Sequence, residues 1–249
     1  MHKLIVVILI CFSATAKTQV YQRNILGNHY SLQQVQQSLI NKSVYHPYPS
    51  TVEEWKSAVS DTVIKSVIAN GESFLHYTFE PISLSLAMEF KRTGDRAKYE
   101  AVQFKKRRAL LALSLAESME NKGRFMEQIA NGVWSVCEES FWGASAHIAQ
   151  TYLPDPEHPI VELFSAETAA ILAITDYLVG NKLDTMNAQI RKRIYFETNK
   201  RIFEPMLHSS ENYFWMSKTN PVNNWNPWIV SNWVEAILLL ENNEERRAQ

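Results

Sequence analysis

The feature that most constrains the fold of this chain is a helical hydrophobic period that returns in one segment after another. Apolar residues recur at helical spacing over 52–68, 96–119, 125–137, 161–178, 185–203 and 227–240. The chain contains no convincing period-two alternation, no glycine-rich phosphate loop and no alternation of strand and helix patterns. Some segments are apolar on most sides and others on one face, which predicts an all-α fold of two concentric helical layers.

Turn and capping residues predict where these helices begin and end. Thr51 belongs to a capping start for a segment with one apolar stripe over 52–68. Gly94 is typical of a helix–helix turn, and a proline-rich loop is expected over 153–159. Gly180 is expected to end the long apolar helix that precedes it.

The composition is that of a globular protein with room for a large core. The 249 residues are 46% hydrophobic and 20% charged, with a formal net charge of -1. A charge so close to zero argues against nucleic acid as the main ligand, because phosphate binding requires a concentrated cationic face. The basic run over 105–108 is interpreted as a solvated face.

The first sixteen residues have the organisation of a secretory signal peptide. Lys3 precedes an apolar run over 4–12 that is too short to span a bilayer, and Ala14 and Ala16 form the cleavage pattern. Cleavage after Ala16 predicts a periplasmic or secreted protein with no membrane association after the signal is removed.

The mature chain is expected to divide into an extension and one helical domain. Residues 17–50 are rich in Gln, Tyr and Asn, contain one short helical segment over 31–40, and end as a linker; the domain covers 51–249. Because Cys11 lies in the signal, Cys137 is the one remaining cysteine and cannot form an internal disulfide. Its apolar helical surroundings favour a buried structural thiol over a nucleophile.

Residues 213–233 hold four of the seven tryptophans and five asparagines. Prolines and asparagines predict a loop here, and Pro227 suits the first turn of the helix that follows. Flat aromatic faces beside planar amides are what a protein offers to a sugar ring, through stacking and hydrogen bonds to hydroxyls or carboxyls. The alternative is a surface loop whose tryptophans are packed inside and whose asparagines only make turns.

A second group of candidates comprises Glu138, Glu139, Trp142 and His147, at the end of an apolar helix. Adjacent residues on a helix point about 100° apart, so at most one of the two carboxylates is expected to face a cleft. Binding of sugar hydroxyls is therefore favoured over acid–base catalysis by the pair. No two histidines of the mature chain lie three or four residues apart, so neither a protein metal site nor any cofactor is predicted.

Three runs in this order resemble the amino-terminal region of heparinase II/III-like polysaccharide lyases: GVWSVCEESFW at 132–142, VELFSAETAA at 161–170 and NNWNPW at 223–228. The similarity covers most of residues 50–249. It implies an incomplete (α/α) toroid of antiparallel helix pairs, followed in the family by further helices and a β-sandwich domain. It also implies β-elimination of an acidic polysaccharide that contains uronic acid.

The resemblance assigns a role to the Asn/Trp loop. Removal of the uronate C5 proton builds negative charge on the sugar carboxylate, and in related lyases an Asn of this loop stabilises it. That role falls to Asn224, with Asn223 as the alternative. Substrate binding is assigned to a larger set: Glu138, Glu139, Trp142, His147, Trp215, Trp225 and Trp228.

Two departures from the family pattern matter. Trp225 stands where relatives often have His, and the family's proton-donating Tyr and catalytic His would follow residue 249. The chain is therefore expected to be the amino-terminal part of a lyase, inactive alone, with the missing carboxy-terminal part of the enzyme as its partner. Two alternatives stay open: an oligosaccharide-binding module that uses Trp215, Trp225 and Trp228, and a glycoside hydrolase that uses Glu139 with Glu162 or Glu167.

Overall fold

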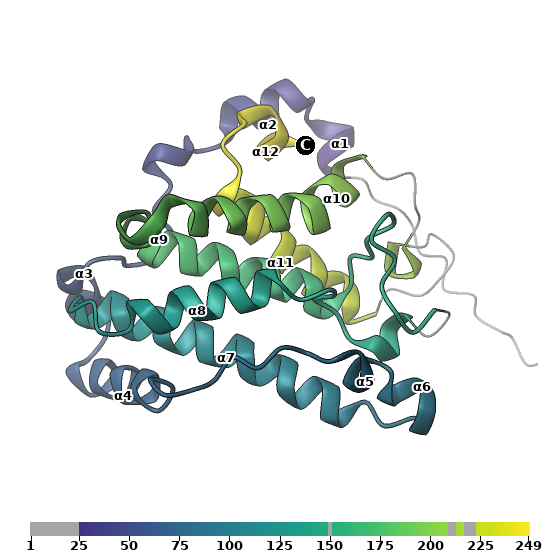
Figure 1. Ribbon diagram of the computed structural model, residues 1–249. Coiled ribbons are helices and arrows are strands. Elements are labelled where there is room, and N and C mark those ends of the chain that lie inside the picture. Colours follow the sequence, from purple (N-terminus) through teal and green to yellow (C-terminus); the bar gives the residue numbers. More distant parts are fainter. Residues whose placement is uncertain (1–24, 149–150, 209–212, 217–222) are drawn as a thin grey trace, which may run out of the picture.

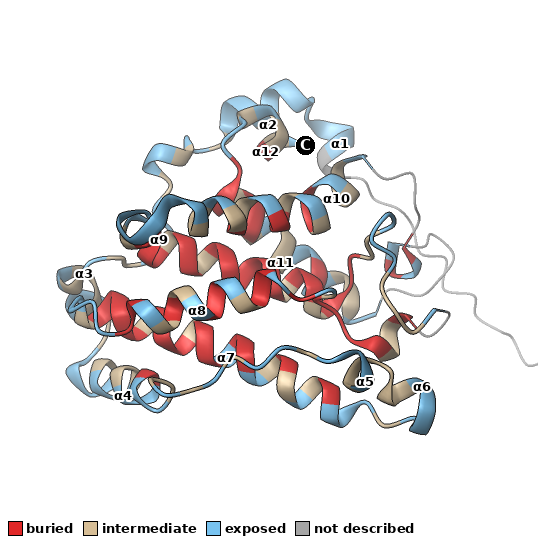
Figure 2. Ribbon diagram, in the orientation of Figure 1, coloured by how far each residue is buried: buried red, intermediate tan, exposed pale blue. Residues whose placement is uncertain are grey.

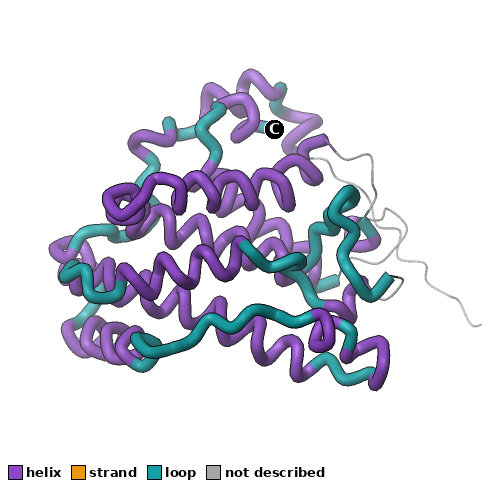
Figure 3. The backbone as a smooth tube through the Cα atoms, in the orientation of Figure 1, coloured by secondary structure: helices purple, strands orange, loops and turns teal. Residues whose placement is uncertain are grey.

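The computed structural model describes residues 25–148, 151–208, 213–216 and 223–249. Over these ranges every regular element is a helix and no strand occurs, which confirms the all-α prediction (Figure 3). The predicted signal peptide lies outside the described residues.

The helices, in chain order, are α1 (Ile25–His29), α2 (Leu32–Ser38), η1 (Lys42–Val44), α3 (Val52–Ala58), α4 (Asp61–Glu72), α5 (Leu84–Ala87), α6 (Glu89–Thr93), α7 (Ala97–Glu120), α8 (Met126–Cys137), η2 (Ser145–Ile148), α9 (Leu163–Thr198), η3 (Asn199–Phe203), α10 (Glu204–His208), η4 (Phe214–Met216), α11 (Trp225–Leu240) and α12 (Glu244–Ala248). The labels α and η mark α-helices and short helices of other types; η3 is a π-helical turn.

The apolar stripe over 52–68 belongs to two helices. Thr51 caps α3 as expected, through a reciprocal capping box with Glu54. Val59 then adopts an extended conformation, and the hydroxyl of Ser60 accepts a hydrogen bond from the amide of Val63, which starts α4. The hydrophobic period over 52–68 predicts one helix, but Ser60 caps a second one, so the segment forms two helices.

The long apolar helix does not end at Gly180. The break in α9 lies at Asn187, whose φ of -170° and ψ of 117° are extended. Arg191 Nε donates to Asp176 at 2.6 Å, although a straight helix would place residues fifteen apart more than ~20 Å from each other, so the chain reverses here. Gly180 lets the returning arm approach, because a Cβ on it would lie 2.9 Å from Arg191.

The core lies where α7, α8, α9 and α11 pack together, and Figure 2 shows their facing sides buried. Leu163–His208 is long and apolar enough to cross a bilayer by length and hydropathy, but 72% of its apolar window is buried inside the molecule. This stretch forms the centre of the helical core.

The described part of the extension is attached to the last helices of the chain. α2 lies beside α12 (Figure 1). Lys42 Nζ donates to the carbonyl of Leu240 at 2.6 Å, and Arg247 Nη1 donates to the carbonyl of Ile40 at 3.1 Å. Residues 25–50 thus contribute a cover over α11 and α12 as well as a connection to α3.

Candidate functional site

The predicted site residues gather at one end of the helical layers. The connection from α8 to α9 and the short η4 lie at this end, where α9 and α11 also begin (Figure 1). The two loops contact each other, because the rings of His147 and Trp225 have centroids 4.7 Å apart. The residues therefore come from distant parts of the sequence but from one region of the fold.

A row of buried polar side chains on α7 holds the loop over 138–148, named here the pinned loop. Tyr99 and Gln103, one helical turn apart, both donate to loop carbonyls. The Tyr99 hydroxyl lies 3.0 Å from the carbonyl of Gly143, and Gln103 Nε2 lies 2.8 Å from that of Trp142. Burial, together with the charge of Glu139, raises the pKa of Tyr99, so its phenol keeps the proton that it donates.

Glu139 is a buried structural carboxylate. Lys106 Nζ lies 2.8 Å from Glu139 Oε1, and Arg107 Nη1 and Nη2 lie 2.7 and 2.5 Å from its two oxygens. Lys106 is fully buried, and the side chain of Glu139 is 2% exposed. The interpretation of 105–108 as a solvated face is therefore wrong for Lys106 and Arg107, which face the interior of the molecule from the middle of α7.

Glu138 has the opposite environment. Its side chain is 52% exposed and pairs with Arg193 Nη1 at 2.9 Å, at the edge of a groove of about 590 Å³. The pinned loop also borders a cavity of about 510 Å³, which reaches the proline-rich loop and the side chains of Arg193, Lys200 and Arg201. Of the two neighbouring carboxylates, only Glu138 is available to a ligand.

Trp142 and Trp215 do not provide stacking surfaces. Trp142 is 1% exposed and donates from Nε1 to the carbonyl of Val136 at 2.8 Å, with Arg201 over its ring. Trp215 is 5% exposed and donates to the carbonyl of Val161 at 2.9 Å. Both indoles are packing residues whose N–H groups bond backbone carbonyls, one at the end of α8 and one before α9, so their assignment to substrate binding does not fit the structure.

His147 connects the pinned loop to the start of α9. Its Nδ1 is hydrogen-bonded to the Glu162 carboxylate, and its ring stacks on Phe164. Glu162 also caps α9, because its Oε1 accepts from the amides of Phe164 and Ser165 at 2.8 and 2.7 Å. With Glu139 and Glu162 both buried and bonded, Glu167 is the remaining carboxylate of the set considered for hydrolysis.

The start of α11 presents polar and aromatic groups to solvent. Asn223 and Asn224 are both exposed, but they are used differently. Asn223 Oδ1 accepts from the amide of Trp225 at 2.9 Å, whereas the side chain of Asn224 makes no hydrogen bond to the described residues. Trp228 is 45% exposed, and Glu167 on α9 lies near its indole. Burial raises the pKa of Glu167, against the opposing effects of Arg107 and Trp228.

Residues 217–222 of the Asn/Trp loop lie outside the described part of the chain. Among the residues that the structure does describe, no three His, Cys, Asp or Glu side chains gather in a way that could hold a metal ion. Cys137 is fully buried, and burial raises the pKa of its thiol to about 12. A thiol with that pKa stays protonated at neutral pH, as a structural cysteine does.

No family model matches this chain, and no curated protein matches it.

Proposed function

We propose that this chain is the helical, substrate-binding part of a secreted or periplasmic lyase that cleaves uronic-acid-containing polysaccharides by β-elimination. In this proposal the helices form part of an (α/α) toroid, and the substrate lies across the end where α9 and α11 begin. The observation that carries the proposal is the exposed amide of Asn224, which makes no hydrogen bond to a described residue, near the half-exposed ring of Trp228.

The chemistry of elimination suits this pair of groups. Loss of the C5 proton moves negative charge onto the uronate carboxylate, and an amide N–H that donates to that carboxylate lowers the barrier. Neither Asn223 nor Asn224 donates a side-chain hydrogen bond to a described residue, but the oxygen of Asn223 accepts from the amide of Trp225, so that side chain already serves the start of the helix. Asn224 is therefore the stronger candidate for the neutralising role.

Trp228 contributes an apolar platform in the first turn of α11. Its indole lies near Glu167 on α9. A ring that is half exposed and held from one side can stack against the apolar face of a pyranose without much loss of side-chain entropy. The ring and the Asn224 amide lie within about one turn of the same helix.

The matched variants Asn224→Asp and Asn223→Asp test the proposal by calorimetric titration with oligogalacturonate and oligoalginate. An aspartate at 224 places a negative charge where the sugar carboxylate would bind, and we expect affinity to fall roughly 10- to 100-fold. Asn223→Asp adds the same charge one residue away and keeps the oxygen that accepts from Trp225. Equal affinities for both variants and the wild type would exclude Asn224 from binding.

Turnover separates the lyase from a simple binding module. The unsaturated uronate produced by elimination absorbs in the ultraviolet, and the chain alone is expected to bind without forming it. Binding that is lost in Trp228→Ala, with no unsaturated product even after a carboxy-terminal partner is added, would favour the binding module. Rapid turnover by this chain alone would show that its own residues supply the acid and the base.

A further inference from the structure

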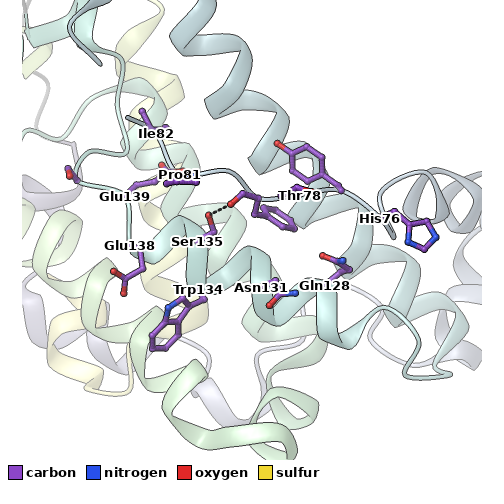
Figure 4. Close-up of a pocket in the computed structure, with 13 residues that line it drawn as sticks. His76, Thr78, Pro81, Ile82, Gln128, Asn131, Trp134, Ser135, Glu138 and Glu139 are labelled. Atoms are coloured by element: carbon purple, nitrogen blue, oxygen red, sulfur yellow. Dashed lines mark hydrogen bonds between the residues drawn. The ribbon is translucent and has the colours of Figure 1, made fainter. Parts of the chain in front are cut away.

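A separate groove of about 590 Å³ lies along α8 (Figure 4). One wall consists of α8 side chains, and the other is the extended segment over 76–82. Neither Asn223, Asn224 nor Trp228 lines it. The groove therefore shares neither the amides nor the ring proposed for the uronate, although Glu138 and Glu139 of the original substrate-binding set lie at its edge.

The α8 wall is a polar and aromatic stripe at helical spacing. Gln128, Asn131, Trp134 and Glu138 follow one another at intervals of three, three and four residues, so they share one face of the helix. Figure 4 shows all four along the same side of α8. The amides of Gln128 and Asn131 make no hydrogen bond to any described residue, so no contact within the described protein uses their donors and acceptors.

Trp134 is held in place while half of its surface stays open. Its exposed fraction is 49%, and the guanidinium of Arg193 lies 5.5 Å from its ring centroid. Arg193 is itself fixed by Glu138 at 2.9 Å and Glu197 at 2.8 Å. A large ring that is oriented from one side and open on the other is ready to stack without first being ordered.

The opposite wall is also formed in advance. Ser135 on α8 donates from Oγ to the carbonyl of Phe79 at 3.2 Å, which ties the two walls together (Figure 4). The rings of Tyr77 and Phe79 meet edge to face, with centroids 4.9 Å apart. The width of the groove is thus set by bonded groups on both sides.

The charge of the lining decides what kind of ligand fits. No Lys or Arg lines the groove, and the one well-exposed carboxylate, Glu138, is paired with Arg193. The nearby Lys105 lies over the Tyr77 ring, 5.3 Å from its centroid, so a uronate would find no cation in the lining itself. A neutral sugar instead needs an aromatic face and amides that can both donate and accept. We propose that this groove binds a neutral pyranose unit of an oligosaccharide, with Trp134 as the platform and Gln128 and Asn131 on the hydroxyls.

Calorimetric titration with three neutral hexasaccharides, cellohexaose, xylohexaose and mannohexaose, tests the proposal. We expect saturable binding of at least one of them and a loss of affinity of roughly tenfold or more in Trp134→Ala, because the buried apolar contact is removed. Trp228→Ala is the matched control and should leave this affinity unchanged. Asn131→Ala removes only an exposed amide, so its thermal unfolding midpoint should equal that of the wild type. Its affinity for the hexasaccharide should nevertheless fall.

Three results would overturn the proposal. They are no saturable binding of any of the three hexasaccharides, equal affinities in wild type and Trp134→Ala, or loss of binding in Trp228→Ala alone. Oligogalacturonate in the same assay separates the two sites, because Trp134→Ala should leave its affinity unchanged. If the protein binds no oligogalacturonate, the comparison of neutral-sugar affinity between the wild type and Trp134→Ala still tests this groove.

Discussion

The pinned loop and the start of α11 lie at the same end of the molecule and are built in opposite ways. The carbonyls and carboxylate of the pinned loop are bonded by buried side chains, including Tyr99, Gln103 and Arg107. At the start of α11 the Asn224 amide and half of the Trp228 ring are open to solvent. A site of this kind combines a rigid support with a few polar and aromatic groups that bond nothing in the described protein. Only those groups have hydrogen-bonding capacity and surface left for a ligand.

The largest effect should come from removing the buried charge of the pinned loop, and its exposed neighbour provides the comparison. Glu139→Gln leaves Lys106 and Arg107 buried with no carboxylate, and we expect a loss of roughly 3–5 kcal/mol in the free energy of unfolding. Glu138→Gln breaks a half-exposed pair and should cost less than about 1 kcal/mol.

Urea unfolding of the two variants measures both values, and the adjacent positions make them a matched pair. Similar losses in the two proteins would show that the buried ion cluster contributes no more than a surface pair. In that case the pinned loop would owe its conformation to the hydrogen bonds of Tyr99 and Gln103 alone.

Packing within the pinned loop gives the next largest effect. A Cβ on Gly143 would contact the Glu162 carboxylate and the Phe141 ring, so Gly143→Ala should destabilise the fold by roughly 1–3 kcal/mol. The displacement of Glu162 should also loosen the cap of α9. A thermal unfolding midpoint equal to that of the wild type would show that the loop tolerates the methyl group by a local shift.

The sequence predicted the long helices well because each one carries its own hydrophobic period. It could not locate the break at Asn187, since Gly180 is the stronger local signal and the reversal depends on Arg191 reaching Asp176. The burial of Lys106 could not be predicted from the sequence either. A basic run is usually solvated, and only the fold brings a distant carboxylate, Glu139, against this one.

Among the site residues, the sequence identified the right segments but not the role of each side chain. Residue type alone does not tell an exposed indole from a buried one, so Trp142 and Trp228 looked alike before folding. Glu162 illustrates the same limit, since its capping role follows from its place in front of α9. The groove beside Trp134 depends on the segment over 76–82, which lies some fifty residues away in the sequence.

At the start of α11, substitutions of the two asparagines should differ in their effect on the free energy of unfolding as well as on ligand binding. Asn223→Ala removes the acceptor for the amide of Trp225 and should cost about 1 kcal/mol in chemical denaturation. Asn224→Ala removes no bond to a described residue and should leave the free energy of unfolding nearly unchanged. If the two substitutions cost the same, Asn224 supports the fold and is a weaker candidate for ligand binding.

The smallest expected effect concerns Glu167, the carboxyl that links the two regions by lying near Arg107 and under Trp228. Burial raises its pKa in the folded protein. Below the ordinary pKa of Glu, about 4.3, the group is protonated in both states and carries no penalty. As the pH rises above that value the unfolded chain loses the proton first, so this group's contribution to stability declines until the pH has passed the raised pKa of the folded state.

Glu167→Gln removes this titration and keeps an acceptor for the Trp228 indole, so the variant should gain stability relative to the wild type as the pH rises through that window. Urea unfolding of both proteins at several pH values between 4 and 7 measures the difference, and other titrating groups cancel in the comparison. A constant difference across this range would mean that Glu167 ionises in the fold as freely as in water. The start of α11 would then be fully solvated around Glu167, and the contrast with the buried cluster at Glu139 would be sharper still.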